Sequence, residues 1–227
     1  FTPTTMTMSA SDILKSMLAI KKAKIEGTDG AQVLGAHLEG PFISPGAIGA
    51  QNSNYLIKPS YKNFEAMTGD AMDAVVSITM APEVDGAKEL ASKKTKKGIR
   101  CSIGHTKATY EEAIEGIKSG FCHSTHLFNA MTGFTHREPG VVGATFDTDI
   151  TTETISDGIH ISYPSLRIAY KQKGTDKTLL VTDAMCACGM PDGEYALGGQ
   201  PVIVKNGAAR LENGALAGSV LTLNKAI

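Results

Sequence analysis

Residues 99–126 read IRCSIGHTKATYEEAIEGIKSGFCHSTH, in which two short apolar runs flank one amphipathic segment. The runs predict strands over 99–103 and 121–125, and the pair Thr109 and Glu112 predicts a capped helix between them. A crossover of this length joins parallel strands. His105 follows the first strand and His126 follows the second, so both histidines are expected at the edge where a parallel sheet gathers its carboxyl ends.

The same alternation of strand and helix extends along the chain in both directions. Strand-end residues fall at 39, 80, 105, 126, 157 and 183, so successive strands are 21 to 41 residues apart, which is room for one crossover helix each. The pattern predicts an α/β protein with a TIM-type (β/α) barrel of the metal-dependent hydrolase kind. Residues 1–4 add a seventh strand, whereas such barrels have eight strands in about 250 residues, so we expect a barrel that lacks its first strand.

After position 183 the pattern changes to short β-prone pieces separated by glycines. Asn206-Gly207 and Asn213-Gly214 are typical of tight hairpins, so residues 193–218 are predicted to form a small β-hairpin excursion near the C-terminus. Ser219 is predicted to start a helix. Residues 1–227 are therefore interpreted as a single incomplete barrel domain that carries this excursion.

Composition limits the classes of protein that fit. The chain has 227 residues, 42% of them hydrophobic and 20% charged, with a net charge of −1, which is typical of a globular domain and does not favour a nucleic-acid partner. No apolar stretch approaches the ~20 residues of a membrane span, so no membrane partner is expected. The four cysteines are too few for a disulfide framework, and together these observations predict a cytoplasmic protein.

Four side chains at predicted strand ends can hold a metal and transfer a proton: Glu39, His105, His126 and Asp183. One glutamate and two histidines leave an open position for water on a divalent metal, and Asp183 could then act as the general base and acid. Taken singly, each residue is also typical of a solvated loop.

Strand alternation predicts which neighbours share the inner face with these residues. Cys101 and Ile103 are expected to face the same way as His105, and Ser124 the same way as His126. His123 is expected on the opposite face, hydrogen-bonded between the strand and a helix.

Two further loops carry polar side chains after predicted strands. His160 follows Ser156-Asp157-Gly158, where Asp157 is expected to cap a turn, and Arg137 lies in a loop before Gly140. An arginine there could bind a phosphate or carboxylate with two hydrogen bonds, or form a loop salt bridge, and spacing alone leaves both possibilities open.

A series of short motifs resembles the N-acetylglucosamine-6-phosphate deacetylase family of the amidohydrolase superfamily, over nearly the whole chain. The motifs occur in this order: HLEGPF (37–42), APE (81–83), GHT (104–106), THLFNAM (125–131), HREPG (136–140), DGIH (157–160), TDAM (182–185) and LAGS (216–219).

The resemblance implies a role for each candidate residue. Glu39, His105 and His126 match the ligands of a divalent metal, which is zinc most often and iron in some members. Asp183 matches the general base and acid, and His160 is expected to assist at the reacting carbonyl.

The sugar and its phosphate are expected to contact His160, Asn129, the backbone of Ala130, and Arg137. Many relatives carry basic residues in the loop that follows the glutamate, where this chain has Ala47 and Ile48. Gln51 in the same loop is expected to offer its amide to the substrate instead.

The implied reaction is metal-dependent hydrolysis of N-acetylglucosamine 6-phosphate to glucosamine 6-phosphate and acetate, in amino-sugar catabolism and cell-wall sugar recycling. The resemblance also implies a small flanking β-domain that is missing here, and a homodimer for the full-length protein. Two alternatives remain at this point: another amidohydrolase that acts on a cyclic amide or ureide, and a catalytically inert truncated core that only binds sugar phosphate.

Overall fold

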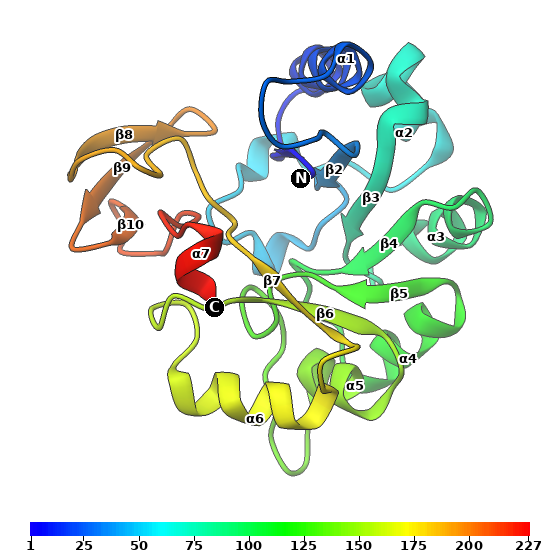
Figure 1. Ribbon diagram of the computed structural model, residues 1–227. Coiled ribbons are helices and arrows are strands. Elements are labelled where there is room, and N and C mark those ends of the chain that lie inside the picture. Colours follow the sequence, from blue (N-terminus) through cyan, green and yellow to red (C-terminus); the bar gives the residue numbers. More distant parts are fainter.

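The computed structural model describes residues 1–227, and its central element is a seven-stranded parallel sheet in the order β1 to β7 (Figure 1). The sheet curls, and the strands follow one another around it in chain order, which supports the α/β class. The strands are β1 (Thr4–Thr5), β2 (Ala36–Glu39), β3 (Val75–Met80), β4 (Arg100–Ile103), β5 (Phe121–Ser124), β6 (Thr151–Ile155) and β7 (Thr178–Val181).

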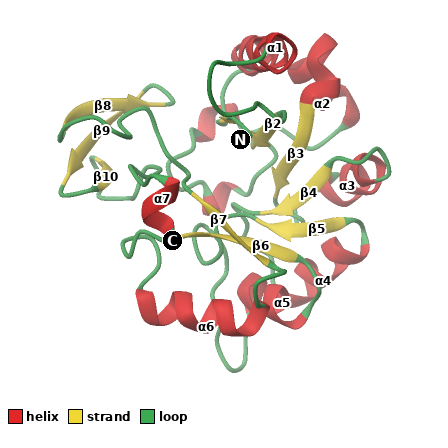
Figure 2. Ribbon diagram, in the orientation of Figure 1, coloured by secondary structure: helices red, strands yellow, loops and turns green.

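Helices cover the outside of this curled sheet (Figure 2). They are α1 (Ala10–Glu26), α2 (Tyr61–Thr68), α3 (Ala87–Thr95), α4 (Tyr110–Lys118), α5 (Gly140–Asp147) and α6 (Tyr163–Lys173), with 3-10 turns at Pro45–Ala47, Ser53–Tyr55 and Gly69–Ala74. The short α7 (Leu223–Ala226) lies beside β7 instead and packs through Ala226 against Ile155. None of the helices combines the length and the apolar character that a membrane span requires.

Local signals place several of these helices correctly. The side chain of Ser9 accepts a hydrogen bond from the backbone of Asp12 and caps the start of α1. The capping box at α4 is confirmed, because Thr109 Oγ1 accepts from the Glu112 backbone at 3.2 Å while the Glu112 side chain accepts from the Thr109 backbone at 2.9 Å.

Two helices of the chain differ from the sequence prediction. Helix α5 was not predicted, because the segment is rich in glycine, valine and threonine, and its helix is stabilised by burial of most of its residues. The predicted helix start at Ser219 is wrong. Ser219 Oγ instead donates to the carbonyl of Thr182 and accepts from the backbone of Leu221, and α7 begins only at Leu223.

The outer face of the sheet is apolar and packs against the helices. Its core includes Leu38, Ile78, Cys101, Ile103 and Phe121, all buried with residues of α1 to α4. The expectation that Cys101 and Ile103 face inward is therefore wrong.

The inner face of the sheet is polar instead. Thr125 Oγ1 lies 2.7 Å from Thr79 Oγ1 and 2.6 Å from Ser102 Oγ. His123 contacts Thr151 Oγ1 at 2.7 Å and Glu153 Oε2 at 3.3 Å on the neighbouring strand, so its predicted place between strand and helix is also wrong.

Residues 193–211 form a separate three-stranded antiparallel sheet, which confirms the predicted excursion. Its strands are β8 (Gly193–Leu197), β9 (Gln200–Lys205) and β10 (Ala208–Leu211). Asn206 and Gly207 both have positive φ, at 53° and 78°, as a tight hairpin turn requires. Gln200 Nε2 donates to the carbonyl of Ala50 at 2.7 Å, which ties this sheet to the long loop after β2.

Lys94 on α3 is a buried cation without a hydrogen-bond partner. Its side chain is 1% exposed, and its Nζ lies 3.4 Å from the centroid of the Phe64 ring and 4.5 Å from that of Tyr61. Burial lowers the pKa of Lys94 from 10.5 to about 8.

The lowered pKa of Lys94 predicts a pH dependence of stability. Because the unfolded chain keeps this proton up to the ordinary pKa, it binds more protons than the folded chain between about pH 8 and 10.5, so the Lys94 contribution to the free energy of unfolding rises with pH across this window. We expect Lys94→Met to lose this rise in urea titrations at pH 7.5 and 9.5. Lys96→Met, at an exposed position of the same segment, should keep it, and equal pH slopes for wild type and Lys94→Met would contradict the assignment.

Candidate metal centre and cavity

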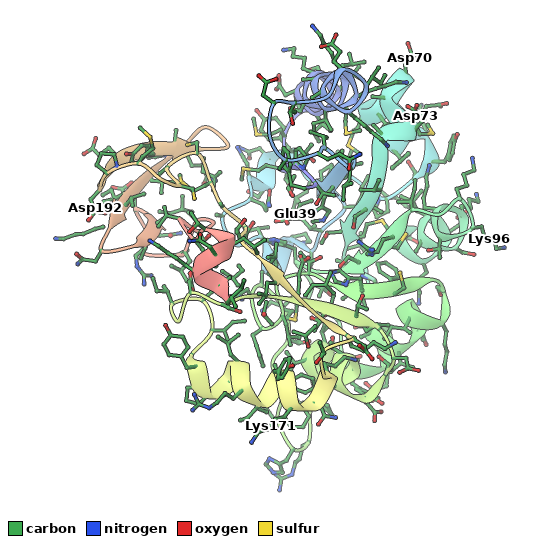
Figure 3. The ribbon with its side chains drawn as sticks, in the orientation of Figure 1. Glu39, Asp70, Asp73, Lys96, Lys171 and Asp192 are labelled. Carbon is green, nitrogen blue, oxygen red and sulfur yellow. The ribbon has the colours of Figure 1, made fainter.

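Three of the predicted site residues converge at the carboxyl ends of the inner strands. Glu39 ends β2, while His105 and His126 follow β4 and β5, and one donor atom from each lies within 4.8 Å of the other two. His105 Nε2 is 3.1 Å and His126 Nε2 is 3.8 Å from Glu39 Oε1, and the two Nε2 atoms are 3.2 Å apart. All three side chains are buried, and Figure 3 shows Glu39 within the curl of the sheet.

A left-handed backbone turns the histidines into this position. His105 has φ 47° and His126 has φ 31°, a region that non-glycine residues rarely adopt. Asp183 after β7 has φ 47° as well. Such conformations cost of order 1–3 kcal/mol each and cluster at functional sites. The turn also explains the errors in predicted side-chain direction, because the alternation of β4 and β5 does not continue into the residues that follow them.

The donor set fits a divalent metal. His105 Nδ1 lies 2.9 Å from the carbonyl of Ala47, which can only accept a hydrogen bond, so Nδ1 carries a proton and Nε2 is the nitrogen that would bind a metal once it has lost its own proton. Two imidazole nitrogens and one carboxylate oxygen are the ligands of catalytic sites with an open position. Glu39, His105 and His126 are thus a preorganised candidate metal centre.

The charges of the triad support the same assignment. Burial alone would raise the pKa of Glu39, but hydrogen bonds from His105 and His126 hold it well below its usual range. Burial alone would lower the pKa of His126, but the Glu39 carboxylate raises it to about 9. Without a metal, His126 therefore keeps a proton beside the ionised Glu39 carboxylate. A metal cation would be favoured at the same place, because its binding releases this proton.

Asp183 lines the same cavity and has a strongly shifted pKa. Burial and then the negative charge of Glu39 raise the pKa of Asp183 to about 7. A carboxyl group with a pKa near neutrality exchanges protons readily at the pH of most cells, which suits a general acid and base.

The cavity that contains these groups has a volume of about 430 Å³. The structure brings eight of the nine predicted site residues to its wall: Glu39, Gln51, His105, His126, Asn129, Ala130, His160 and Asp183. Arg137 is the exception. It is exposed on the loop before α5, and its Nη1 lies 2.7 Å from His136 Nε2, away from the cavity.

Two of the wall residues are held by contacts that the sequence did not indicate. Gln51 is buried, its Nε2 donates to Glu39 Oε1 at 2.9 Å, and its Oε1 accepts from the Thr7 backbone at 2.7 Å. Both ends of this amide are thus occupied within the protein and orient a candidate metal ligand. Asp157 caps its turn as predicted and also accepts from His160 Nδ1 at 2.7 Å, which leaves His160 Nε2 for a ligand.

The sequence reasoning missed several wall residues. They come from the end of β1, the β8 excursion, the segment before α7 and the loop after β4: Thr4, Thr5, Met6, Leu197, Leu216 and Lys107. Only Lys107 carried a signal that could have been used, because it follows a candidate metal ligand by two residues.

The fold and this site define an α/β protein with a candidate metal centre and a buried carboxyl group of raised pKa at the carboxyl end of a curled parallel sheet. No protein-family model matches the chain. The comparisons with known proteins confirm the resemblance found in the motifs: the chain is related over its whole length to the N-acetylglucosamine-6-phosphate deacetylases.

Two curated relatives and one solved structure illustrate this relation. The deacetylase of Lysinibacillus sphaericus is 41% identical over 231 residues, covering 100% of this chain and 59% of its own length, and that of Bacillus subtilis is 39% identical, covering 99% and 58%. A mutant of the deacetylase from Mycobacterium smegmatis, solved in complex with N-acetyl-D-glucosamine 6-phosphate, matches with a TM-score of 0.94 at 31% identity, covering 99% of this chain and 58% of that one. The chain therefore spans about three fifths of the length of the curated relatives that it matches.

Proposed function

We propose that this protein hydrolyses the acetamide of N-acetylglucosamine 6-phosphate to glucosamine 6-phosphate and acetate, with a divalent metal. The observation that carries the proposal is the convergence of Glu39, His105, His126 and Asp183 on one cavity in a chain related throughout to deacetylases of this kind. Residues 1–227 are proposed to form a single (β/α)-barrel catalytic domain, with 193–218 as an excursion from it.

Five residues of the cavity have a defined task in the proposed reaction. Glu39, His105 and His126 would hold the metal, which supplies Lewis-acid polarisation of the acetyl carbonyl and a water of lowered pKa. Asp183, with its pKa near 7, takes a proton from the attacking water and returns it to the amine nitrogen as the carbon–nitrogen bond breaks. His160, fixed through Nδ1 by Asp157, directs Nε2 to the sugar.

Further properties are proposed on the same relation. Zinc suits a set of two imidazoles and one carboxylate, with iron as the other ion this set would accept. All four cysteines are unpaired, which agrees with a reducing compartment such as the cytoplasm. A homodimer, which would bring further residues to the cavity mouth, completes the proposal.

A substrate panel tests the proposed function. We expect kcat/KM for N-acetylglucosamine 6-phosphate to exceed that for N-acetylglucosamine by about 100-fold or more, because contacts to a phosphate can contribute several kcal/mol of transition-state binding. Release of acetate and of the free amine should be measured for both sugars and for cyclic ureides. Equal activity on both sugars, or preference for a ureide, would show a different amidohydrolase, and no turnover by the metal-loaded protein would show an inert core.

A further inference from the structure

The cavity wall contains a single lysine or arginine, Lys107, among its 24 residues. The loop from Ser44 to Gln51, which forms much of one wall, carries no basic residue, and Arg137 lies outside the cavity. Glu39 and Asp183 make the inner end of the cavity acidic. Any dianionic group bound in this cavity therefore finds one permanent positive charge of this chain, at Lys107.

The backbone of Lys107 is fixed by its neighbours. Its N–H donates to Glu83 Oε1 at 2.7 Å, while Thr106 Oγ1 donates to Glu83 Oε2 at 2.5 Å. Glu83 thus holds the start of this loop through both carboxylate oxygens, two residues beyond His105. The lysine is positioned by the same turn that positions a candidate metal ligand.

The side chain of Lys107 lies against the 3-10 turn Pro45–Ala47. A Cβ added at Gly46 would lie 3.0 Å from Lys107 Cγ and 3.4 Å from its Cε, so the aliphatic stem packs over this glycine. The residue is exposed, and its Nζ has no ion pair and no hydrogen-bond partner within the protein. Other exposed lysines, such as Lys58 and Lys88, do have carboxylate partners. The structure therefore presents an uncompensated ammonium group at the cavity wall.

We propose that Lys107 binds the phosphate group of the substrate and determines the preference for a phosphorylated sugar. This inference rests on the proposed function. The acetamide at C2 and the phosphate at C6 lie at opposite ends of a pyranose ring. A substrate whose acetamide meets Asp183 would therefore extend its phosphate away from Asp183, toward the part of the cavity wall that Lys107 forms. Lysine binds phosphate as a point charge and needs no fixed orientation, which suits a flexible side chain at an open mouth.

The test compares Lys107→Met with wild type in kinetics and in binding. Because a charge-assisted contact to phosphate is lost, KM for N-acetylglucosamine 6-phosphate should rise about 10- to 100-fold, whereas kcat, metal content and KM for N-acetylglucosamine should stay at wild-type values. Lys107→Arg should recover most of the affinity. Lys171→Met, which removes an exposed lysine of α6 that lies well away from Glu39 in Figure 3 and does not line the cavity, should leave every parameter unchanged.

Calorimetric titration with glucosamine 6-phosphate separates failure of this inference from failure of the proposed function. Weaker binding to Lys107→Met than to wild type supports the inference even if the wild-type protein shows no turnover. Equal binding to both proteins, or no binding to wild type, overturns it, and so does an unchanged KM for the phosphorylated sugar.

Discussion

Replacing Asp183 with asparagine should lower kcat by about 10²- to 10⁴-fold while the metal content stays at the wild-type level. Proton transfer by a positioned group accounts for an effect of this size, and the amide of asparagine does not exchange a proton near neutral pH. The metal should remain because Glu39, His105 and His126 are unaltered. Asparagine also tolerates the left-handed backbone found at position 183, so the variant is expected to fold.

Asp70→Asn is a suitable control for this experiment. Asp70 is exposed on the outer surface, far from Glu39 in Figure 3, and the same chemical change there should leave kcat unaltered. Turnover should be followed by acetate release at saturating substrate, and metal by elemental analysis of the same samples. If Asp183→Asn keeps wild-type turnover, another group carries the proton.

Replacing Glu39 with glutamine should weaken metal binding by at least ~100-fold. Glu39 is the only anion of the triad, and it also accepts the hydrogen bond from Gln51, so its loss leaves two neutral imidazoles as ligands. Changing a residue that only hydrogen-bonds to a metal ligand already costs about 10- to 100-fold in affinity, and removal of an anionic ligand should cost more. Turnover should fall in proportion to the metal lost at a given concentration of free zinc.

Metal-buffered titrations followed by elemental analysis would measure this affinity. His126→Asn should show a loss similar to that of Glu39→Gln, because each variant removes one donor of the same triad. His136→Asn changes an exposed histidine outside the cavity and should bind metal as the wild type does. Full metal occupancy in both triad variants would place the metal elsewhere.

The candidate metal centre was predictable because parallel strands in chain order bring their carboxyl ends to one edge of the sheet. The positions of Glu39, His105 and His126 after apolar runs therefore implied that they meet, and the structure brings their donor atoms within 4.8 Å of one another. The same reasoning placed Asp183, which follows β7, beside them, and it lines the same cavity.

The directions of side chains and the paths of loops were not predictable in the same way. A period-two alternation assigns His123 to the outer face only if the strand continues unchanged to His126, and the left-handed residue at 126 breaks that rule. The pairing of Gln51 with Glu39 and Thr7 depends on how the long loop after β2 folds back. Thr7 and Gln51 are 44 residues apart in the sequence. Such contacts are set by tertiary packing and leave no periodic signal.

His105, His126 and Asp183 all have a backbone conformation that glycine or asparagine adopts more easily. In a lineage that no longer used this chemistry, substitution by either residue would relieve strain of order 1–3 kcal/mol at each position. Decay of the activity would then increase the stability of the fold, so drift would erase the site faster than it erases an ordinary surface patch.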